Sequence, residues 1–162
     1  MITIRPATAN DANELQRLLK ELASGLGQAD DLTSKAENLA AIALTKVPGF
    51  HAHIAIDETT DQAVGMVFFF AEYSTWRGEA GVYIQDLYVD KNQRGSGLGV
   101  RLLKAAAKTG QQWHAKHLRL AVDFDNPLGR KFYERVGFKE QPQYCITQLT
   151  GSSFMTLLEA DV

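Results

Sequence analysis

The chain has 162 residues and a mass of 17.9 kDa, which is the size of one ordinary domain. Hydrophobic residues make up 45% of it and charged residues 22%, which excludes a disordered or low-complexity chain. The one cysteine, Cys145, excludes an internal disulfide and a cysteine-based metal cluster, so a reducing compartment is expected. We therefore expect a single domain over residues 1–162 in the cytoplasm, without a bound metal.

Neither an export signal nor a membrane-spanning segment is predicted. The longest apolar run, residues 63–71, is far shorter than the roughly 20 residues that a membrane-spanning helix needs. Residues 1–11 show no basic region followed by an apolar stretch. No membrane partner is therefore expected.

Charge is distributed unevenly along the chain. Residues 86–139 carry 11 basic and 5 acidic side chains, whereas the whole chain has a net charge of −2. A nucleic-acid-binding protein is more often basic throughout, so no nucleic acid is expected as a partner. A local positive zone suits a small polyanionic ligand, and the acidic remainder suits a cationic one. Solvated helix faces that happen to cluster would give the same pattern, and charge alone does not separate the two explanations.

The N-terminal half is predicted to combine two helices with antiparallel strands. A strand at residues 2–5 ends at Pro6, and helices follow from a Thr8-x-x-Asp11 capping box to Gly25 and from a Ser34-x-x-Glu37 box to about Leu44. After a Pro48-Gly49 turn, strands are predicted at residues 50–56, 63–73 and 81–90.

The C-terminal half is predicted to open with a glycine-rich turn at residues 93–99. A helix to about Trp113, a strand at 117–124, a helix from Pro127 to Gly137, and two paired strands at 143–149 and 152–159 follow. This order predicts a mixed α/β fold. A central, mostly antiparallel sheet is flanked by helices and contains one parallel strand–glycine turn–helix–strand unit.

The glycine turn carries the most specific signal in the sequence. Arg94-Gly95-Ser96-Gly97-Leu98-Gly99 lies between a predicted strand and a helix, where backbone N–H groups at the positive end of the helix form an anion site. A P-loop is excluded because Val100-Arg101 follows Gly99, where Lys-Ser/Thr would be needed. The Gly-x-Gly-x-x-Gly spacing of a dinucleotide turn is also absent. A plain tight turn would need only one or two glycines.

These residues resemble the acetyl-CoA-binding motif of the GNAT (GCN5-related) N-acetyltransferases. The motif is Arg94-x-x-Gly97-x-Gly99 after the strand residues 83–89, and residues 126–138 resemble that family's second cofactor segment. The resemblance covers nearly the whole chain. Within the family, the sequence is most similar to the spermidine/spermine (diamine) acetyltransferases, for example in Tyr83-x-x-Asp86. Two departures concern the polyamine site: residues 24–27 lack that branch's tyrosine and glutamates, and Gln85 replaces an acidic residue.

The resemblance implies a set of cofactor-binding residues. The diphosphate of acetyl-CoA would bind the backbone of the glycine turn, and the pantetheine arm would pair with the preceding strand. A bulge in that strand would aim one N–H, that of Leu87, at the thioester oxygen as it gains charge. The implied cofactor-binding residues are Leu87, Tyr88, Val89, Arg94, Gly95, Ser96, Gly97, Leu98, Gly99, Val100 and Asn126.

Two residues are the candidates for proton transfer. By resemblance Tyr133 would donate a proton to the departing sulfur, although with Phe132 it would also suit core packing. Asp86 is the leading candidate for the base that takes a proton from the amine, and a structural cap is the alternative role for it. Glu72, Glu79 and Asp30 are further candidates for the base.

The acceptor is expected to be a primary amine on a small cationic molecule. Trp76, Gln85 and Asp30 are the candidate substrate-binding residues, with core packing as the alternative for Trp76. A protein N-terminus or an aminoglycoside are other possible acceptors, and a CoA-binding sensor without turnover is the alternative outside catalysis. By resemblance we also expect a homodimer, for which the apolar final strands could supply the interface.

Overall fold

The fold, in a computed structural model that describes residues 1–43 and 50–159, is built on one five-stranded sheet. The strands are β1 Ile2–Pro6, β2 Phe50–Asp57, β3 Gln62–Ser74, β4 Glu79–Val89 and β5 Leu118–Leu120; the helices are α1 Ala12–Gly25, α2 Ala36–Ala43, α3 Leu98–Gly110, α4 Pro127–Val136 and α5 Gly151–Glu159. The chain divides into two compact units, Met1–Pro127 with the sheet and Leu128–Val162 with α5 and most of α4. Whether these units form a single domain stays a prediction.

The sheet has the mixed topology that the sequence predicts. The strands lie in the order β1-β2-β3-β4-β5, and each neighbouring pair is antiparallel except β4 and β5, which are parallel. The connection between these parallel strands carries the glycine turn and α3. The predicted parallel strand–turn–helix–strand unit is therefore confirmed.

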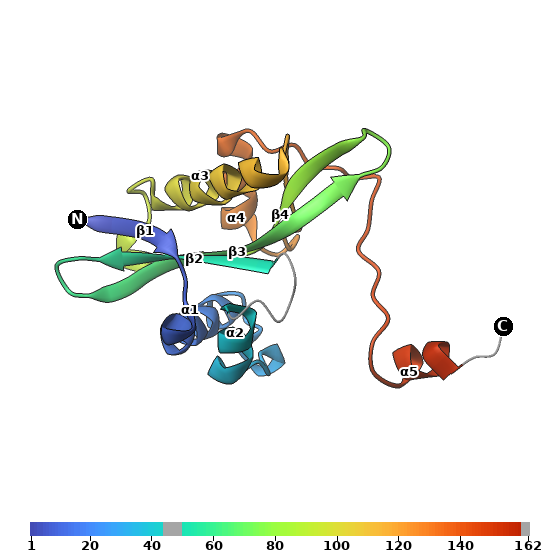
Figure 1. Cartoon of the computed structure of the whole chain (residues 1–162), viewed down its shortest axis with the longest axis horizontal. Coiled ribbons are helices and arrows are strands. Elements are labelled where there is room, and N and C mark those ends of the chain that lie inside the picture. Colours follow the sequence, from blue (N-terminus) through green and yellow to red (C-terminus); the bar gives the residue numbers. More distant parts are fainter. Residues whose placement is uncertain (44–49, 160–162) are drawn as a thin grey trace. The chain divides into compact units, whose positions relative to one another are not determined.

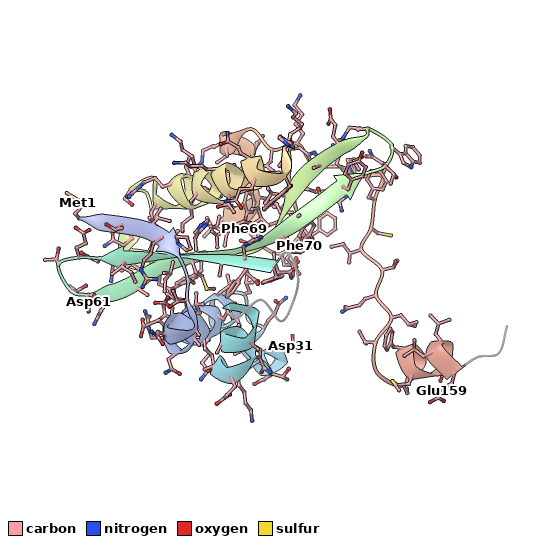
Figure 2. All side chains as sticks on the ribbon, viewed as in Figure 1. Met1, Asp31, Asp61, Phe69, Phe70 and Glu159 are labelled. Atoms are coloured by element: carbon pink, nitrogen blue, oxygen red, sulfur yellow. The ribbon has the colours of Figure 1, made fainter. Side chains whose placement is uncertain are left out.

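Helices cover both faces of the sheet (Figure 1). Helices α1 and α2 lie on one face, which we call the α1/α2 face, and α3 lies on the other, the α3 face. The predicted apolar stripe of α1 is confirmed because Leu15, Leu18 and Leu19 are buried against residues of β2 and β3. Neighbouring residues Phe69 and Phe70, labelled in Figure 2, serve opposite faces: Phe69 is buried near the histidines of β2, and Phe70 stacks on Phe50 and Tyr83.

The start of α1 is held by a buried ion pair. Two guanidinium nitrogens of Arg5 donate to the carboxylate of Asp11 at 2.8 and 2.7 Å, and the backbone N–H of Thr8 donates to the same carboxylate at 2.7 Å. The hydrogen bond from Arg5, followed by those from Thr8, lowers the pKa of Asp11 to about 2. The predicted Thr8-x-x-Asp11 capping box is thus confirmed.

The second predicted box has a different acceptor. The backbone N–H of Lys35 donates to the side-chain oxygen of Asn38 at 2.8 Å, one residue beyond the predicted Ser34 and Glu37. Helix α2 then runs over Ala36–Ala43. The predicted helix end at Leu44 and the Pro48-Gly49 turn lie outside the described residues.

The two predicted C-terminal strands are wrong. Residues 139–150 have no regular secondary structure, and residues 151–159 form α5 in place of a strand. Phe154, Leu157 and Leu158 have the i, i+3, i+4 spacing of a helical stripe, which the strand prediction did not use. In the described residues this segment has no strand partner, so a helix satisfies the backbone groups within the segment itself. Cys145 lies in the irregular stretch and is exposed.

Strand β5 is also shorter than predicted. It pairs with β4 over only three residues, Leu118–Leu120, where the sequence predicts a strand over 117–124. The pairing ends at Ile84 of β4 because the next residue of that strand lies at a bulge.

In the part of the chain that the structure describes, no helix is long and apolar enough to cross a membrane.

A pair of glycines at helix ends tests the packing of α3. Gly110 closes α3 with its Cα facing Val82, and a Cβ added there would overlap the Val82 side chain and lie 3.0 Å from the Cβ of Ala115. Gly25 closes α1, and a Cβ there would meet nothing within 4 Å. Gly110→Ala is expected to lower the free energy of unfolding by about 1 to 3 kcal/mol because Val82 is fully buried.

Gly25→Ala is the matched control. Alanine favours helix over glycine, so this variant is expected to raise the free energy of unfolding by up to about 1 kcal/mol. Urea denaturation of both variants measures the difference, and a stabilised Gly110→Ala variant would show that α3 does not pack on β4 as described.

Candidate functional site

A bulge in β4 changes which face of the sheet its side chains occupy. Phe69 pairs with Ile84 and the next residue back, Phe68, pairs with Asp86, so Gln85 is the extra residue. Without the bulge, Asp86 would share the α3 face with Ile84, because side chains alternate along a strand. The bulge instead turns Asp86 toward the α1/α2 face, where its cross-strand partner Phe68 is part of the core against α1.

The bulge also leaves one edge of β4 open. Pairing with β5 stops at Ile84, so residues 85–89 have no described strand on that side. The N–H of Asp90 donates to the carbonyl of Val64 on β3 at 2.9 Å. Because backbone N–H groups alternate in direction along a strand, those of Leu87 and Val89 point away from β3, into the open side. The bulge that the resemblance implies is therefore present, and it is located at Gln85.

The glycine turn follows directly from this open edge. The carboxylate of Asp90 accepts the N–H of Asn92 at 2.8 Å, and the guanidinium of Arg94 donates to the carbonyl of Val89 at 3.2 Å. The hydroxyl of Ser96 donates to the carbonyl of Gln93 at 2.7 Å. These side chains hold the turn in shape and leave its outer surface to the backbone.

Two glycines give the turn a conformation that other residues avoid. Gly95 and Gly97 have φ angles of 81° and 82°, and a Cβ on either would meet nothing within 4 Å. Gly97 is the N-cap of α3, so the first backbone N–H groups of that helix have no partner within it. Leu98, which is buried, anchors the helix start, and Gly99 and Val100 follow in its first turn. The result is an unobstructed backbone surface at a helix N-terminus, which fits a diphosphate.

Asp86 has the properties of a proton acceptor. Its side chain is half-buried, and burial raises the pKa of its carboxyl above the ordinary value for aspartate. No ion pair or side-chain hydrogen bond to Asp86 is found among residues 1–43 and 50–159. A carboxylate that is buried without a compensating cation and lies beside an open strand edge is suited to take a proton from a ligand.

The other candidate bases are less suited to that role. Glu72 is held on both oxygens, by Nε2 of His117 and a guanidinium nitrogen of Arg119, each at 2.9 Å. Glu79 lies 3.7 Å from the guanidinium of Arg77 at the end of the β3–β4 hairpin. Asp30 is exposed on the short 3-10 helix Ala29–Asp31 that follows α1.

Trp76 is not brought to Asp86 within the chain. It occupies the turn between β3 and β4 and is 95% exposed. Asp86 lies seven residues beyond Glu79 on β4, one of which is the bulged Gln85, so the two are about 20 Å of strand apart. Gln85, at the bulge, is exposed and adjoins Asp86.

Tyr133 and Asn126 belong to different units of the structure. Asn126 ends the first unit, in a turn where its backbone N–H donates to the carbonyl of Asp123 at 3.1 Å. Tyr133 lies in α4 of the second unit and packs edge-on against Phe132 and Phe138, with ring centroids 5.1 and 5.5 Å away. The role of Tyr133 as a proton donor therefore stays a prediction.

A buried link between α1 and β4 was not predicted from the sequence. The hydroxyl of Tyr88 donates to the carboxylate of Glu21 at 2.7 Å, and Arg17 donates to the other oxygen of Glu21 at 2.7 Å. Burial and then Glu21 raise the pKa of Tyr88 to about 12. The two partners are 67 residues apart in the chain, so no local pattern indicates the contact.

A cavity of about 230 Å³ lies at the start of β2 and is lined in part by Phe68, the cross-strand partner of Asp86. His51, His53, Phe50 and Thr109 are among its lining residues, and neither Asp86 nor the glycine turn lines it. Burial lowers the pKa of both histidines, so they are neutral at pH 7. Among the described residues, no group of three or more acidic, histidine or cysteine side chains could hold a metal ion.

Known proteins resemble this arrangement in sequence and in fold. A family model described as the acetyltransferase (GNAT) family matches residues 13–138. The chain is 28% identical over 145 residues to the thialysine N-epsilon-acetyltransferase of Bos taurus, covering 86% of this chain and 85% of that one. It is 33% identical over 141 residues to the human spermidine/spermine N(1)-acetyltransferase-like protein 1, covering 83% of this chain and 20% of that one.

A solved structure supports the same architecture. An integron cassette protein from V. cholerae superimposes with a TM-score of 0.78 and 19% sequence identity, covering 98% of both chains. At that identity the match shows a shared fold and nothing about the ligand.

Removing the charge of Asp86 and removing the charge of Asp11 are expected to change the free energy of unfolding in opposite directions. Burial raises the pKa of Asp86, so ionising it destabilises the fold, and this cost is absent below the ordinary aspartate pKa and grows as pH rises through the folded value. Asp86→Asn is therefore expected to raise the free energy of unfolding at pH 7 and to have little effect at pH 3.

Asp11→Asn is the control with the opposite sign. Its lowered pKa means that the charge stabilises the fold above about pH 4, and the stability is lost as pH falls toward 2. Asp11→Asn is expected to cost about 1 to 2 kcal/mol at pH 7, since Arg5 is partly exposed, and much less at pH 2, where about half of the Asp11 carboxyl is protonated. Urea denaturation across this pH range measures both, and destabilisation by both variants at pH 7 would contradict the assignment of Asp86.

Proposed function

The chain belongs to the acetyltransferase (GNAT) family and is an acyltransferase that depends on acetyl-CoA, and we propose that it acetylates a primary amine of a small cationic molecule by direct attack of the amine on the thioester. The observation that carries this proposal is the position of Asp86. Its half-buried carboxyl has no ion pair or side-chain hydrogen bond among the described residues, and it adjoins Leu87, whose N–H points into the open side of β4. A base and an oxyanion donor on successive residues are what amine acylation needs.

The glycine turn and the open edge of β4 would hold acetyl-CoA, which supplies an activated acetyl group. The backbone N–H groups from Gly95 to Val100 would bind the diphosphate, because the positive φ angles of Gly95 and Gly97 leave that surface free of side chains. Leu87, Tyr88 and Val89 would pair with the amide-bearing arm as a strand does. Asn126 would bind that arm from the other side.

The side chains of this protein move the protons. Asp86 accepts the proton that the amine loses as the nitrogen–carbon bond forms. The N–H of Leu87 donates a hydrogen bond to the thioester oxygen as negative charge develops there. Tyr133 donates a proton to the sulfur as the carbon–sulfur bond breaks and its electron pair goes to sulfur, so the products are an amide and a free thiol.

The relatives and the site both favour a small amine as the acceptor. The bovine relative is named for the ε-amine of thialysine and the human relative for spermidine and spermine, and each of these is a small cationic amine. Gln85, Asp30 and Trp76 are the proposed substrate-binding residues. Since the turn that holds Trp76 precedes Glu79, which is itself about 20 Å of strand away from Asp86, the contribution of Trp76 would come from a second copy of the chain.

We also propose a homodimer in the cytoplasm. The C-terminal unit exposes large apolar side chains that a monomer does not normally leave in water: Tyr144, Ile146, Leu149, Phe154, Met155, Leu157 and Leu158. The free, exposed Cys145 is compatible with a reducing compartment. A molar mass in solution equal to that of one 17.9 kDa chain would contradict the dimer.

A thiol-release assay over a panel of amines tests the proposed function. With acetyl-CoA present, polyamines, lysine-like amino acids, aminoglycosides and N-terminal peptides are compared, and product with a small amine is expected. Tyr133→Phe is expected to lower kcat by about 10²-fold or more with little change in the affinity for acetyl-CoA. Tight binding of CoA without turnover of any amine would instead identify a sensor, and product only with peptides or aminoglycosides would identify one of those acceptors.

A matched glycine pair tests the diphosphate site. Gly97 and Gly27 both have a positive φ, 82° and 72°, and a Cβ on either meets nothing within 4 Å. Alanine therefore strains the backbone at either position by a similar amount, on the order of 1 kcal/mol. Gly97→Ala is expected to weaken acetyl-CoA binding about tenfold or more, measured by calorimetry, because the Cβ occupies the surface that the diphosphate needs. Equal weakening by Gly27→Ala would show that the effect is only one of stability.

A further inference from the structure

A row of aromatic rings runs across three strands, beside Asp86, on the α1/α2 face of the sheet. Phe50, Phe70 and Tyr83, which we call the aromatic row, come from β2, β3 and β4. Phe70 stacks on Phe50 and on Tyr83, with ring centroids 5.9 and 5.0 Å apart and interplanar angles of 20° and 26°. Phe70, labelled in Figure 2, is half-buried like the other two rings. The row therefore presents an apolar surface to a ligand.

The bulge at Gln85 brings the aromatic row and Asp86 onto the same face. Tyr83 pairs with Phe70, and Asp86 pairs with Phe68, which lies two residues before Phe70 on β3. Tyr83 and Asp86 are three residues apart on β4, but because Gln85 is bulged they span only the two-residue length between Phe70 and Phe68, about 7 Å of strand. A ligand whose amine lies at Asp86 can thus extend its body toward Tyr83.

Arg119, on β5, lies at the Tyr83 end of the aromatic row. Its guanidinium carbon is 5.6 Å from the ring centroid of Tyr83, and its side chain is 67% exposed. One guanidinium nitrogen contacts Glu72 at 2.9 Å. A guanidinium has five N–H donors in a planar fork, so this single contact leaves donors for an anion. Tyr83 and Glu72 are its only partners among the described residues.

The nearby carboxylate does not offer a site for a second ammonium group. Glu72 is only 11% exposed, and its two oxygens contact His117 and Arg119. A diamine with one nitrogen at Asp86 would bring its other ammonium to the guanidinium of Arg119, where like charges repel. The Tyr83 end of the aromatic row, where Arg119 lies, therefore favours an anion over a cation.

We propose that Arg119 is a substrate-binding residue that selects amines carrying a carboxylate, so that the acceptor is an ω-amino acid of about the length of lysine. Six bonds separate Nζ from the carboxylate carbon of lysine and span about 7 to 8 Å when extended, which is comparable to the roughly 7 Å of strand between Asp86 and Tyr83. The apolar methylene chain of the amino acid lies on Tyr83 and Phe70. This inference rests on the proposed function and narrows its substrate class.

A matched pair of amines tests the proposal directly. Lysine and cadaverine share the same chain and the same terminal amine, and only lysine carries a carboxylate. The wild-type protein is expected to acetylate lysine with a kcat/KM about tenfold or more above that for cadaverine. Arg119→Gln is expected to abolish this preference: the KM for lysine rises about tenfold or more with little change in kcat, and the kcat/KM for cadaverine rises because the repulsion of its second ammonium is removed. Arg119→Lys retains the charge and is expected to keep part of the preference.

Arg77→Gln is the control for loss of an arginine. Arg77 is also exposed and also lies near a glutamate, but it belongs to the β3–β4 turn and is remote from Asp86. This variant is expected to leave the ratio of the two substrates unchanged. Equal kcat/KM for lysine and cadaverine in the wild-type protein, or an unchanged ratio in Arg119→Gln, would overturn the proposal.

A binding measurement separates this proposal from the proposed function. In the presence of CoA, lysine is expected to raise the Tm of the wild-type protein more than cadaverine does, and Arg119→Gln is expected to lose that difference. This result without turnover of any amine would refute acetyl transfer while supporting carboxylate recognition by Arg119. Turnover of amines with the same lysine-to-cadaverine ratio in the wild type and in Arg119→Gln would support acetyl transfer and refute carboxylate recognition by Arg119.

Discussion

One extra residue in β4 determines the arrangement of the whole site. The bulge at Gln85 shifts the pairing of β4 with β3, turns Asp86 toward the α1/α2 face, and ends the pairing with β5 at Ile84. A side chain and a strand edge thus become available at the same place, because an added residue changes both the facing of side chains and the hydrogen-bond ladder. The acid–base group and the backbone donors of the proposed reaction both depend on this irregularity.

The two buried aspartates of the structure illustrate how function and stability differ. Asp11 is surrounded by donors from Arg5 and Thr8, so its charge strengthens the fold. Asp86 is half-buried and has no such partner in the part of the chain that the structure describes, so its charge is a cost that the packing of β3 and β4 must offset. Such an uncompensated charge is common where a protein must exchange protons with a ligand, since a paired carboxylate is a poor base.

Regular patterns in the sequence predicted the elements that are stabilised locally. The capping box at Thr8, the leucine stripe of α1, and Pro127 and Gly137 around α4 all act within one or two helical turns, and each is confirmed. The predicted C-terminal strands are wrong because the apolar residues of 151–159 have helical spacing and no described strand pairs with this segment. The predicted length of β5 is wrong for a similar reason, since only the bulge in its partner strand β4 explains where β5 ends.

By itself, the sequence determined the glycine turn, since positive φ angles at Gly95 and Gly97 and a helix start at Leu98 are local properties of the chain. It also indicated the acetyltransferase family and Asp86 as the leading candidate for the base. Only the tertiary structure decided what surrounds that carboxyl: the pairing of Tyr88 with Glu21, the ion pairs that occupy Glu72, and the aromatic row that ends at Arg119. These contacts join residues from strands and helices far apart in the chain, and they depend on a strand register that one bulged residue changes.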